Sequence, residues 1–425
     1  MIELITLLTG LLVGPQALEL RATPEVVRVE AWLDGDRIAT RDAPPWRLEI
    51  DLGDTLAPHR LDLRAFDAAG APIATVRRAL NGARPTTDDE ATSTPLQVVF
   101  DGATPDPEQL ADVFAVGGQT LEVVRVGRGS PRIALVLTPD ARSRLEDLAE
   151  SYLKNHVVQR SSERQTSFRR PWNPAVLENP ERFLDEAEPL FDVGGRRRQE
   201  LDLSQLWGLF ERSIPWPEGT RIRLVNPLAA PVSRLASSTR VFNVSRRGSA
   251  DGGGLLFHAV QARPRIDFDL RLADAVAVAA LGLRSPGEGR SADDPLAVVV
   301  LVGDDGEDAS RFGLDAVRTY LAQIDVALFV AGWRDGETLA TLWGPGATDL
   351  RPATRRGETL PGAQDALDPL EEAAAGWRQT LERQAVVWLA GDHRRSEVRL
   401  RETQTTPRAV GVRRAVQLPS AEVPR

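Results

Sequence analysis

An unbroken apolar run lies near the middle of the chain at residues 296–302, and residues 325–332 repeat the pattern after an initial aspartate. Runs of this length that are rich in β-branched side chains predict strands buried on both faces of a parallel sheet. Between the runs, apolar side chains recur at helical spacing, at Leu314, Val317, Leu321 and Ile324. Strand, helix and strand then form one right-handed crossover unit. The acidic loop of residues 303–310 falls at the carboxyl end of the first strand, where open α/β sheets carry their sites.

Residues 1–82 instead alternate apolar and polar positions with a period of two. Residues 27–33 show this pattern, and Asp34-Gly35 then offers the positive φ angles of a tight hairpin. Short alternating strands at regular spacing predict an immunoglobulin-like β-sandwich. The apolar stretch 4–13 is too short to span a membrane and follows no positively charged segment, so we interpret it as a first β-strand.

A linker rich in proline and polar residues is predicted at residues 83–95, and residues 96–418 after it predict one α/β domain. The expected strands of this domain are residues 96–100, 132–138, 221–225, 238–245 and 385–390, with a hairpin turned at Gly117-Gly118. Its expected helices are residues 145–152, 203–210, 270–283 and 370–381.

Two further segments complete this domain. Residues 156–200 are irregular and rich in arginine, which predicts an insertion, and residues 385–418 predict a C-terminal β extension. The expected fold class is therefore all-β plus α/β. An N-terminal sandwich precedes a doubly wound, mainly parallel sheet.

Composition and charge narrow the function classes. With 42% hydrophobic and 27% charged residues among 425, the chain is long enough for two or three folded domains. The net charge of -9 argues against nucleic-acid binding, because phosphate backbones attract basic surfaces. The chain has no cysteine, which excludes disulfides, thiolate catalysis and cysteine metal sites.

Several segments together resemble a known family. The strand 296–302 and the loop VGDDGEDAS that ends it resemble the fourth strand and the Thr-Asp-Gly-Glu-Asp type loop of a von Willebrand factor A domain. The sequence GGGLLFHA from Gly252 resembles the family's Gly-Gly-Thr-x-Leu-Tyr-Asp-Ala. The segment RQAVVWLA from Arg383 and the residues after it resemble the tail of a bacterial subfamily. The N-terminal VRVEAWLDGDRIATRDAPPW is similar to bacterial immunoglobulin-like modules, which are usually spacers or adhesion units.

The resemblance also implies where a metal would bind. The family commonly holds a divalent cation through an Asp-x-Ser-x-Ser loop after the first strand, a Thr, and the Asp of the acidic loop. A hard cation takes such oxygen ligands in octahedral order. In this chain Thr138, Asp140 and Arg142 replace the first set, and Gly254 takes the place of the Thr. Only Asp305 keeps the family's ligand.

Two hypotheses follow for this face of the molecule. One is an altered Mg²⁺ or Mn²⁺ site made of Asp140, Ser143 and Asp305. The other, which we prefer, is a domain without metal or cofactor whose acidic loop is solvated or paired with Arg142. In both cases the resemblance implies that a protein partner binds a face formed by Asp140, Arg142, Ser143, Gly252, Gly253, Gly254, Asp304, Asp305, Glu307 and Asp308.

Enzyme classes find little support in the residues. The four histidines form no HxxxH or HExxH pair of a zinc hydrolase, and no GxSxG marks a nucleophile elbow. Ser249 and His258 could form a hydrolytic dyad, although a histidine within the apolar residues 255–260 is more often a packed core residue. The acids of residues 304–308 are more often a hydrated loop than the paired carboxylates of a glycosidase.

We therefore expect a non-enzymatic protein-binding or scaffold protein without a transmembrane segment. The family resemblance points to the cell envelope or to export, and the lack of a convincing signal peptide leaves a cytoplasmic location open. A metal-dependent adhesion module and a serine hydrolase are the alternatives. The residues leave the oligomeric state open.

Overall fold

The computed structural model describes the chain in segments: residues 1–82 without 7 and 9, 93–145, 216–217, 219–231, 240–241, 244–249, 269–284, 291–351, 363–395, 397–401 and 412–415. Within them, antiparallel sheets accompany one larger sheet with five parallel strands and helices. This agrees with the expected combination of all-β and α/β structure. The helix predicted at residues 203–210 and the insertion predicted at 156–200 lie outside the described residues.

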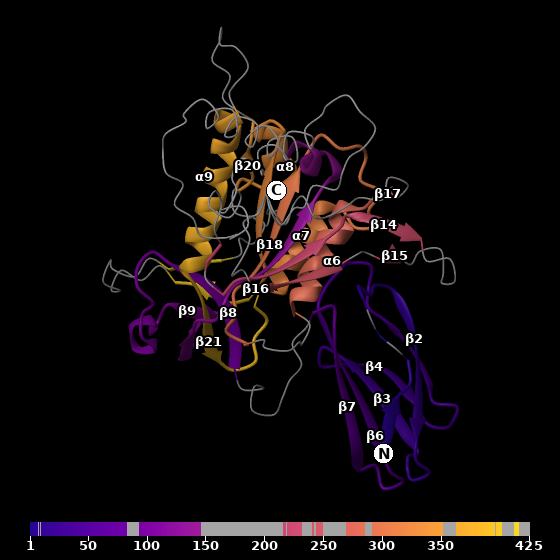
Figure 1. Ribbon diagram of the computed structural model, residues 1–425. Helices are drawn as coiled ribbons and strands as arrows, with labels where there is room; N and C mark the ends of the chain where they lie inside the picture. Colours follow the sequence, from indigo (N-terminus) through magenta and orange to yellow (C-terminus); the bar gives the residue numbers. More distant parts are fainter. Residues whose placement is uncertain are drawn as a thin grey trace, which may run out of the picture.

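The N-terminal residues 1–82 fold into two antiparallel sheets around one apolar core, at the lower right of Figure 1. One sheet has the order β1-β2-β5, with strands Ile2–Leu4, Pro15–Ala22 and Arg47–Asp51. The other has the order β4-β3-β6-β7, with strands Asp36–Arg41, Arg28–Leu33, His59–Phe66 and Pro72–Leu80. Strand alternation turns the apolar positions of both sheets inward, and the fully buried ones include Val29, Ala31, Leu61 and Leu63.

The apolar stretch 4–13 is not the strand that the sequence predicted. β1 ends at Leu4, and the chain then turns through Gly10 and Gly14, whose φ angles are 82° and 70°. The apolar side chains fill gaps between elements instead of pairing in a ladder. Leu12 packs against the N-terminal core, and Val13 packs against the helices of the next domain.

The N-terminal module is docked against the α/β domain. Val13 and Leu56 belong to the same apolar cluster as Tyr320, which lies on a helix of that domain. The Tyr320 hydroxyl donates a hydrogen bond of 3.0 Å to the Asn81 carbonyl. The Asn81 side chain in turn exchanges hydrogen bonds of 2.8 and 2.7 Å with the backbone of Leu12. These contacts hold the module in one orientation, which a free spacer would not have.

A further antiparallel sheet joins the start of the α/β region to the end of the chain. Its order is β11-β21-β8-β23, with strands Val123–Gly127, Gln384–Ala390, Ser93–Phe100 and Val412–Arg414. Residues 93–95 are therefore strand and not the end of the predicted linker. The Thr94 hydroxyl donates to the Gly391 carbonyl at 2.7 Å, which fixes the start of β8 against the end of β21. The predicted hairpin at Gly117-Gly118 is present, between β9 (Phe114–Val116) and β10 (Gln119–Thr120), and β22 (Arg399–Leu400) pairs with β9.

The large sheet has the order β16-β13-β12-β18-β19-β20. Its strands are Val244–Ser249, Arg221–Val225, Arg132–Leu137, Leu296–Val302, Ala327–Gly332 and Thr348–Asp349. All neighbours are parallel except β16, which is an antiparallel edge strand. The predictions for residues 221–225 and 296–302 coincide with β13 and β18. The edge strand expected at 238–245 lies several residues later in the chain.

Helices cover both faces of this sheet (Figure 1). On one face, α6 (Leu272–Arg284), α7 (Leu314–Gln323) and α8 (Gly336–Trp343) form a core with Val298 and Val300. On the other, α9 (Ala363–Glu382) and a helix that starts at Pro139 form a core with Val299 and Leu301. Successive residues of β18 point to opposite faces, so a strand covered on both sides needs an unbroken apolar run.

Three short strands, β14 (Leu228–Pro231), β15 (Arg240–Val241) and β17 (Asp269–Leu270), form a small antiparallel sheet beside the start of α6. Among the helices of the described segments, none combines the length and the apolar character needed to cross a bilayer.

Candidate functional site

Three loops meet at the carboxyl edge of the large sheet. β12 and β18 are adjacent and parallel, with Leu137 opposite Leu301, so the loops that follow them start side by side. β19 lies on the other side of β18 and is followed by Trp333 and Arg334. Parallel strands thus bring together the residues after position 137, the acidic loop and Arg334.

The first two loops hold each other through reciprocal hydrogen bonds. The Asp140 amide donates to Asp305 Oδ1 at 2.8 Å, and the Asp304 amide donates to Asp140 Oδ2 at 2.7 Å. The buried Thr138 hydroxyl accepts from the Gly303 amide at 2.9 Å. A Cβ on Gly303 would lie 2.3 Å from Asp140 Oδ2 and 2.4 Å from the Ala141 nitrogen. This approach is therefore open only to glycine.

Two guanidinium groups neutralise this cluster of acids. Arg144 Nε donates to Asp140 Oδ2 at 2.7 Å, one helical turn away. Arg334 Nε donates to the Gly303 carbonyl at 2.8 Å, and Nη2 donates to the Asp305 carbonyl at 3.0 Å. Burial alone would raise the pKa of the Asp140 carboxyl. The Arg144 guanidinium and the Asp304 amide outweigh burial, and they hold that pKa below its ordinary value.

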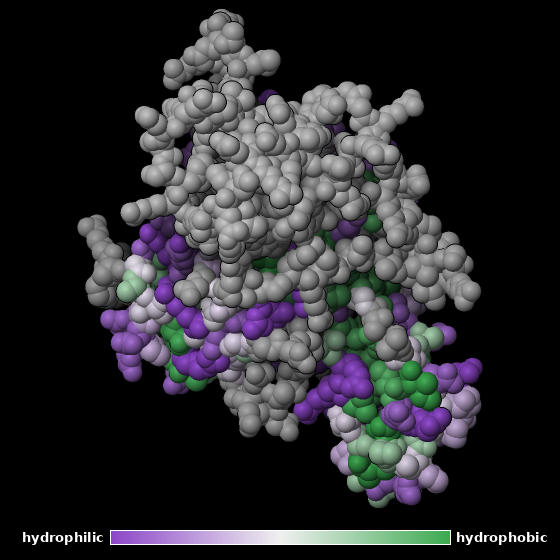
Figure 2. Space-filling view, viewed as in Figure 1, coloured by the Kyte–Doolittle hydropathy of each residue, from purple (hydrophilic) through white to green (hydrophobic). Residues whose placement is uncertain are grey.

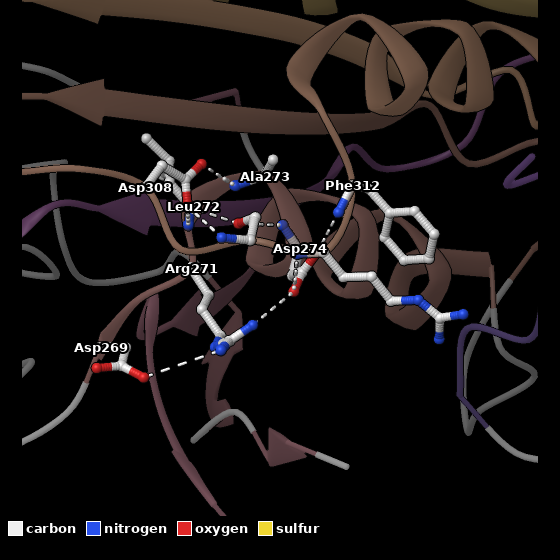
Figure 3. A network of polar contacts seen from close by, with 9 residues as sticks. Asp269, Arg271, Leu272, Ala273, Asp274, Asp308 and Phe312 are labelled. Carbon is white, nitrogen blue, oxygen red and sulfur yellow. Dashed lines mark hydrogen bonds and ion pairs between the residues drawn. The ribbon is translucent and has the colours of Figure 1, made fainter. Parts of the chain in front are cut away.

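The far end of the acidic loop is tied to the start of α6 (Figure 3). Asp308 accepts hydrogen bonds from the amides of Leu272 and Ala273 at 2.9 and 3.1 Å. Asp274 points back and accepts from the amides of Arg311 and Phe312 at 3.0 and 3.1 Å. Each carboxylate thus satisfies amides of the other segment. The two form a structural clasp between helix and loop.

Aspartate–arginine pairs recur along this edge of the sheet. After β12, Asp140 pairs with Arg144. Between the ends of β18 and β19, Arg334 Nη2 lies 3.6 Å from Asp304 Oδ1. At the end of β20, Asp349 pairs with Arg351 at 2.7 Å. Burial would raise the pKa of the Asp349 carboxyl, and the Arg351 guanidinium lowers it below its ordinary value.

The structure separates the predicted site residues into three groups. Asp140, Asp304 and Asp305 are brought together as predicted. Asp308 is nearby but serves the α6 clasp, while Glu307 and Ser143 are exposed. Gly252, Gly253, Gly254 and His258 lie outside the described residues.

The sequence offered Arg142 as a partner of the acidic loop, and the structure places the guanidinium groups of Arg144 and Arg334 against this cluster. Arg142 is buried, 8% exposed, and its amide continues the helix by donating to the Thr138 carbonyl at 2.9 Å. Residues two apart on a helix point in different directions, whereas residues four apart lie on one side. Arg144 therefore reaches Asp140, and Asp305 Oδ2 is buried and accepts no hydrogen bond from the described residues.

The arrangement does not fit a hard divalent cation. Such an ion needs about six oxygen ligands with lone pairs directed at it. Here Thr138 Oγ1, Asp140 Oδ2 and Asp305 Oδ1 already accept from N–H groups, and two guanidiniums supply the positive charge. Across the described segments, no three His, Cys, Asp or Glu side chains are grouped so that they could hold a metal ion. Asp305 Oδ2 is buried and accepts no hydrogen bond from the described residues.

Ser249, the nucleophile of the hydrolase alternative, lies far from these acids along the sheet. It is the last residue of β16 and pairs with Arg221, the first residue of β13. Because β13 runs parallel to β12 and β18, Ser249 lies at the amino edge of the sheet, opposite the acidic loop. The loop therefore cannot supply a carboxylate to a catalytic serine at position 249.

Several functional residues escaped the sequence analysis. Arg144 could have been found, since it follows Asp140 by one helical turn. Arg334 comes directly after a predicted strand, but its contact with the neighbouring loop is not local in sequence. Asp274 and Arg271 stand at the start of a correctly predicted helix, where an acidic residue commonly satisfies exposed amides.

Comparison with known proteins adds little to this description. No family model matches the sequence, and no curated protein matches it. Among solved structures, the fibronectin(III)-like modules of Clostridium thermocellum CbhA match with 16% identity and a TM-score of 0.17. That match covers 19% of this chain and 93% of the module.

Proposed function

We propose that this chain is a non-enzymatic protein-binding scaffold built on a von Willebrand factor A-like domain, in which arginines take the place of the metal ion. The large sheet supports this assignment, since it combines an acidic loop at the carboxyl end of β18 with one antiparallel edge strand, β16. We infer that the N-terminal module is immunoglobulin-like. We assign the protein to the cell envelope on the family resemblance alone, and its recovery in an envelope fraction tests that assignment.

The start of α6 offers a further match to the family's Gly-Gly-Thr-x-Leu-Tyr-Asp-Ala pattern. Leu272, Asp274 and Ala275 stand where the pattern has Leu, Asp and Ala, at the helix that clasps the acidic loop. The Thr of the pattern then falls on Leu270, which has no side-chain oxygen. This alignment, an alternative to the one at Gly252, supports the family assignment at the position of α6. In both alignments the Thr position carries no side-chain oxygen.

The observation that carries the proposal is the charge arrangement at the carboxyl edge. Arg334, whose side chain is 25% exposed, holds the backbone of the acidic loop, while the Asp304 side chain is 78% exposed. Glu307 and Ser143 are exposed beside it. The loop is therefore ordered from within by guanidinium groups and presents carboxylates outward, which suits a partner with basic side chains.

Charge reversal of the exposed acids tests this face. Asp304→Arg with Glu307→Arg leaves the internal hydrogen bonds of Asp140 and Asp305 in place, whereas changes at Arg142 or Asp305 would disturb the fold. We expect a partner cross-linked to the full chain in extracts of the source cells to be lost in this variant. The matched control Glu3→Arg with Glu49→Arg makes the same charge change on the exposed N-terminal module. Equal capture by all three proteins would place partner binding elsewhere.

A metal-dependent adhesion module is the second candidate, favoured by the unsatisfied Asp305 Oδ2. Thermal unfolding in EDTA and then in Mg²⁺ or Mn²⁺ separates the two functions. A cation at a hundredfold excess over its Kd would add about 2.7 kcal/mol of stability. If arginines occupy the site, Mg²⁺ or Mn²⁺ should not change the melting temperature of the wild type or of Asp305→Ala. A shift that disappears in Asp305→Ala would establish the metal-dependent candidate.

A further inference from the structure

A second charged surface lies on the N-terminal module, on the outer face of the β4-β3-β6-β7 sheet. In β3, Val29 and Ala31 point into the core, so Arg28, Glu30 and Trp32 point away from it. The register opposite them is continuous: Arg28 pairs with Phe66, Glu30 with Arg64 and Trp32 with Asp62. Arg37 of β4 stands beside Trp32 on the same face. We call the set Arg28, Glu30, Trp32, Arg37, Arg64 and Phe66 the arginine face.

Aromatic rings fix two of these guanidinium groups in place. Arg64 lies over the Trp32 ring with 4.2 Å between its Cζ and the ring centroid, and Arg28 lies over Phe66 at 4.5 Å. Such stacking immobilises the plane of the guanidinium and leaves its N–H edges directed sideways. The side chains of both arginines are 37% exposed, so the edges remain accessible.

A buried acid holds the centre of the face together. The Glu30 side chain is 4% exposed and accepts from Trp32 Nε1 at 3.0 Å and from Arg37 Nη1 at 3.2 Å. Arg28 Nε lies 3.4 Å from the same carboxylate. The carboxylate is thus below the surface, while Arg37 extends outward with 57% of its side chain exposed. Asp62, opposite Trp32 in the register, lies on the same face with its Oδ2 3.6 Å from Arg64 Nη2. Three arginines against two carboxylates leave one positive charge on this face, in a chain whose net charge is -9.

The chemistry of the face selects one class of partner. Arg64 covers a face of the Trp32 ring and Glu30 takes the indole N–H, so this tryptophan does not offer a sugar-stacking platform. Fixed guanidinium edges match carboxylates, which they bind through two parallel hydrogen bonds. We propose that the arginine face binds a carboxylate-rich segment of a protein partner.

Figure 2 shows hydrophobic and hydrophilic residues side by side on the visible surface of this module. Large exposed apolar side chains of the module include Ile38 on β4 and Ile73 on β7. The charge pattern itself carries the proposal.

Binding of a fluorescein-labelled, glutamate-rich peptide to the full chain tests the inference. We expect anisotropy titrations at low salt to show binding that weakens as ionic strength rises. Arg37→Gln with Arg64→Gln should weaken it about tenfold, since each exposed pair contributes up to about fivefold. Arg64→Lys keeps the charge but loses the planar fork, and should still weaken binding about threefold.

The control is Arg41→Gln with Arg47→Gln, which removes two exposed arginines of the same module outside the face. Unchanged peptide binding in this control, with every variant still folded at the assay temperature, would support the arginine face. Equal loss in both double variants would overturn it in favour of general charge attraction. Tighter binding of phosphatidylglycerol vesicles or heparin than of the peptide, through the same arginines, would overturn the assignment to a protein partner.

Discussion

The carboxyl edge of the large sheet and the arginine face of the N-terminal module both contain ion pairs between an acid and an arginine. The two regions differ in which partner is the more buried one. At the edge, Arg334 lies behind the acidic loop and Asp304 faces solvent. On the arginine face, Glu30 is buried and Arg37 faces solvent. In each region the more buried partner sets the geometry, and the more exposed partner provides the charge that another molecule meets.

The two regions differ in how the backbone positions the paired side chains. At the edge, the groups come from loops after three separate strands, and amide hydrogen bonds such as Asp304 to Asp140 hold them together. On the arginine face, they come from adjacent strands in register and are held by side chains stacked on side chains. Disturbing the backbone should therefore damage the edge most, whereas removing one side chain should damage the face.

The largest effect should come from Gly303→Ala, which forces a Cβ against the Asp140 carboxylate and the Ala141 backbone. We expect a loss of about 3 kcal/mol in the free energy of unfolding, because neither neighbour is a flexible chain end. Urea unfolding measures it. Gly306→Ala is the matched control in the same loop, where a Cβ would meet nothing within 4 Å, and it should change stability by less than about 0.5 kcal/mol. Similar losses in the two variants would show that the loops do not interlock at Gly303.

Glu30→Ala should have the next largest effect, at about 2 kcal/mol. It removes the acceptor of Trp32 Nε1 and the counter-charge of Arg28 and Arg37, which are partly exposed and can turn toward water. Glu49→Ala, at an exposed position in the same module, should leave the unfolding midpoint nearly unchanged. The measurement is the unfolding of the N-terminal module followed by tryptophan fluorescence. A Glu30→Ala protein as stable as the control would show that the arginines need no buried carboxylate.

The same contrast explains how much of the molecule its sequence could predict. Strand β18 was located at the correct residues because a doubly covered strand leaves an unbroken apolar run in the chain. The stretch 4–13 is also rich in apolar residues, but Gly10 and Gly14 turn it into a loop whose side chains Leu12 and Val13 pack into two different cores. An apolar run indicates that the segment is buried. It forms a strand only where a neighbouring strand is available to pair with it.

The sequence predicted the acidic residues of the candidate site but not the arginines that contact them. Asp140 and Asp305 follow predicted strands, so parallel pairing alone brings them together. The contact of Arg334 with Gly303 depends on how β19 ends relative to β18, which no local pattern encodes. Arg142 was offered as the partner of the acidic loop because of its place in a family motif. The helix that starts at Pro139 turns it inward and brings Arg144 to Asp140 instead.

A smaller effect is expected from Arg334→Gln, which should loosen the acidic loop without unfolding the domain. The change removes two hydrogen bonds to the loop backbone and should cost about 1 kcal/mol locally. Amides of residues 303–310 should then exchange with deuterium about fivefold faster. Arg351→Gln is the control, since Arg351 pairs with Asp349 on the same edge without touching the loop. Unchanged exchange in Arg334→Gln would mean that the amide hydrogen bonds suffice to order the loop.

The smallest effect concerns pH and separates Arg144 from the other partners of Asp140. The pKa of the Asp140 carboxyl is lower in the folded chain than in the unfolded one, so the charged carboxylate favours folding. This contribution is complete above the ordinary pKa of about 4 and disappears as pH falls through the lower folded pKa. The stability difference between wild type and Asp140→Asn should therefore shrink on acidification below about pH 4. In an Arg144→Gln background the difference should be smaller at neutral pH and should fade at a higher pH, because the guanidinium no longer lowers the pKa. If Arg144→Gln left this profile unchanged, the Asp304 amide would be the group that holds the Asp140 carboxylate, and the carboxyl edge would depend on backbone contacts alone.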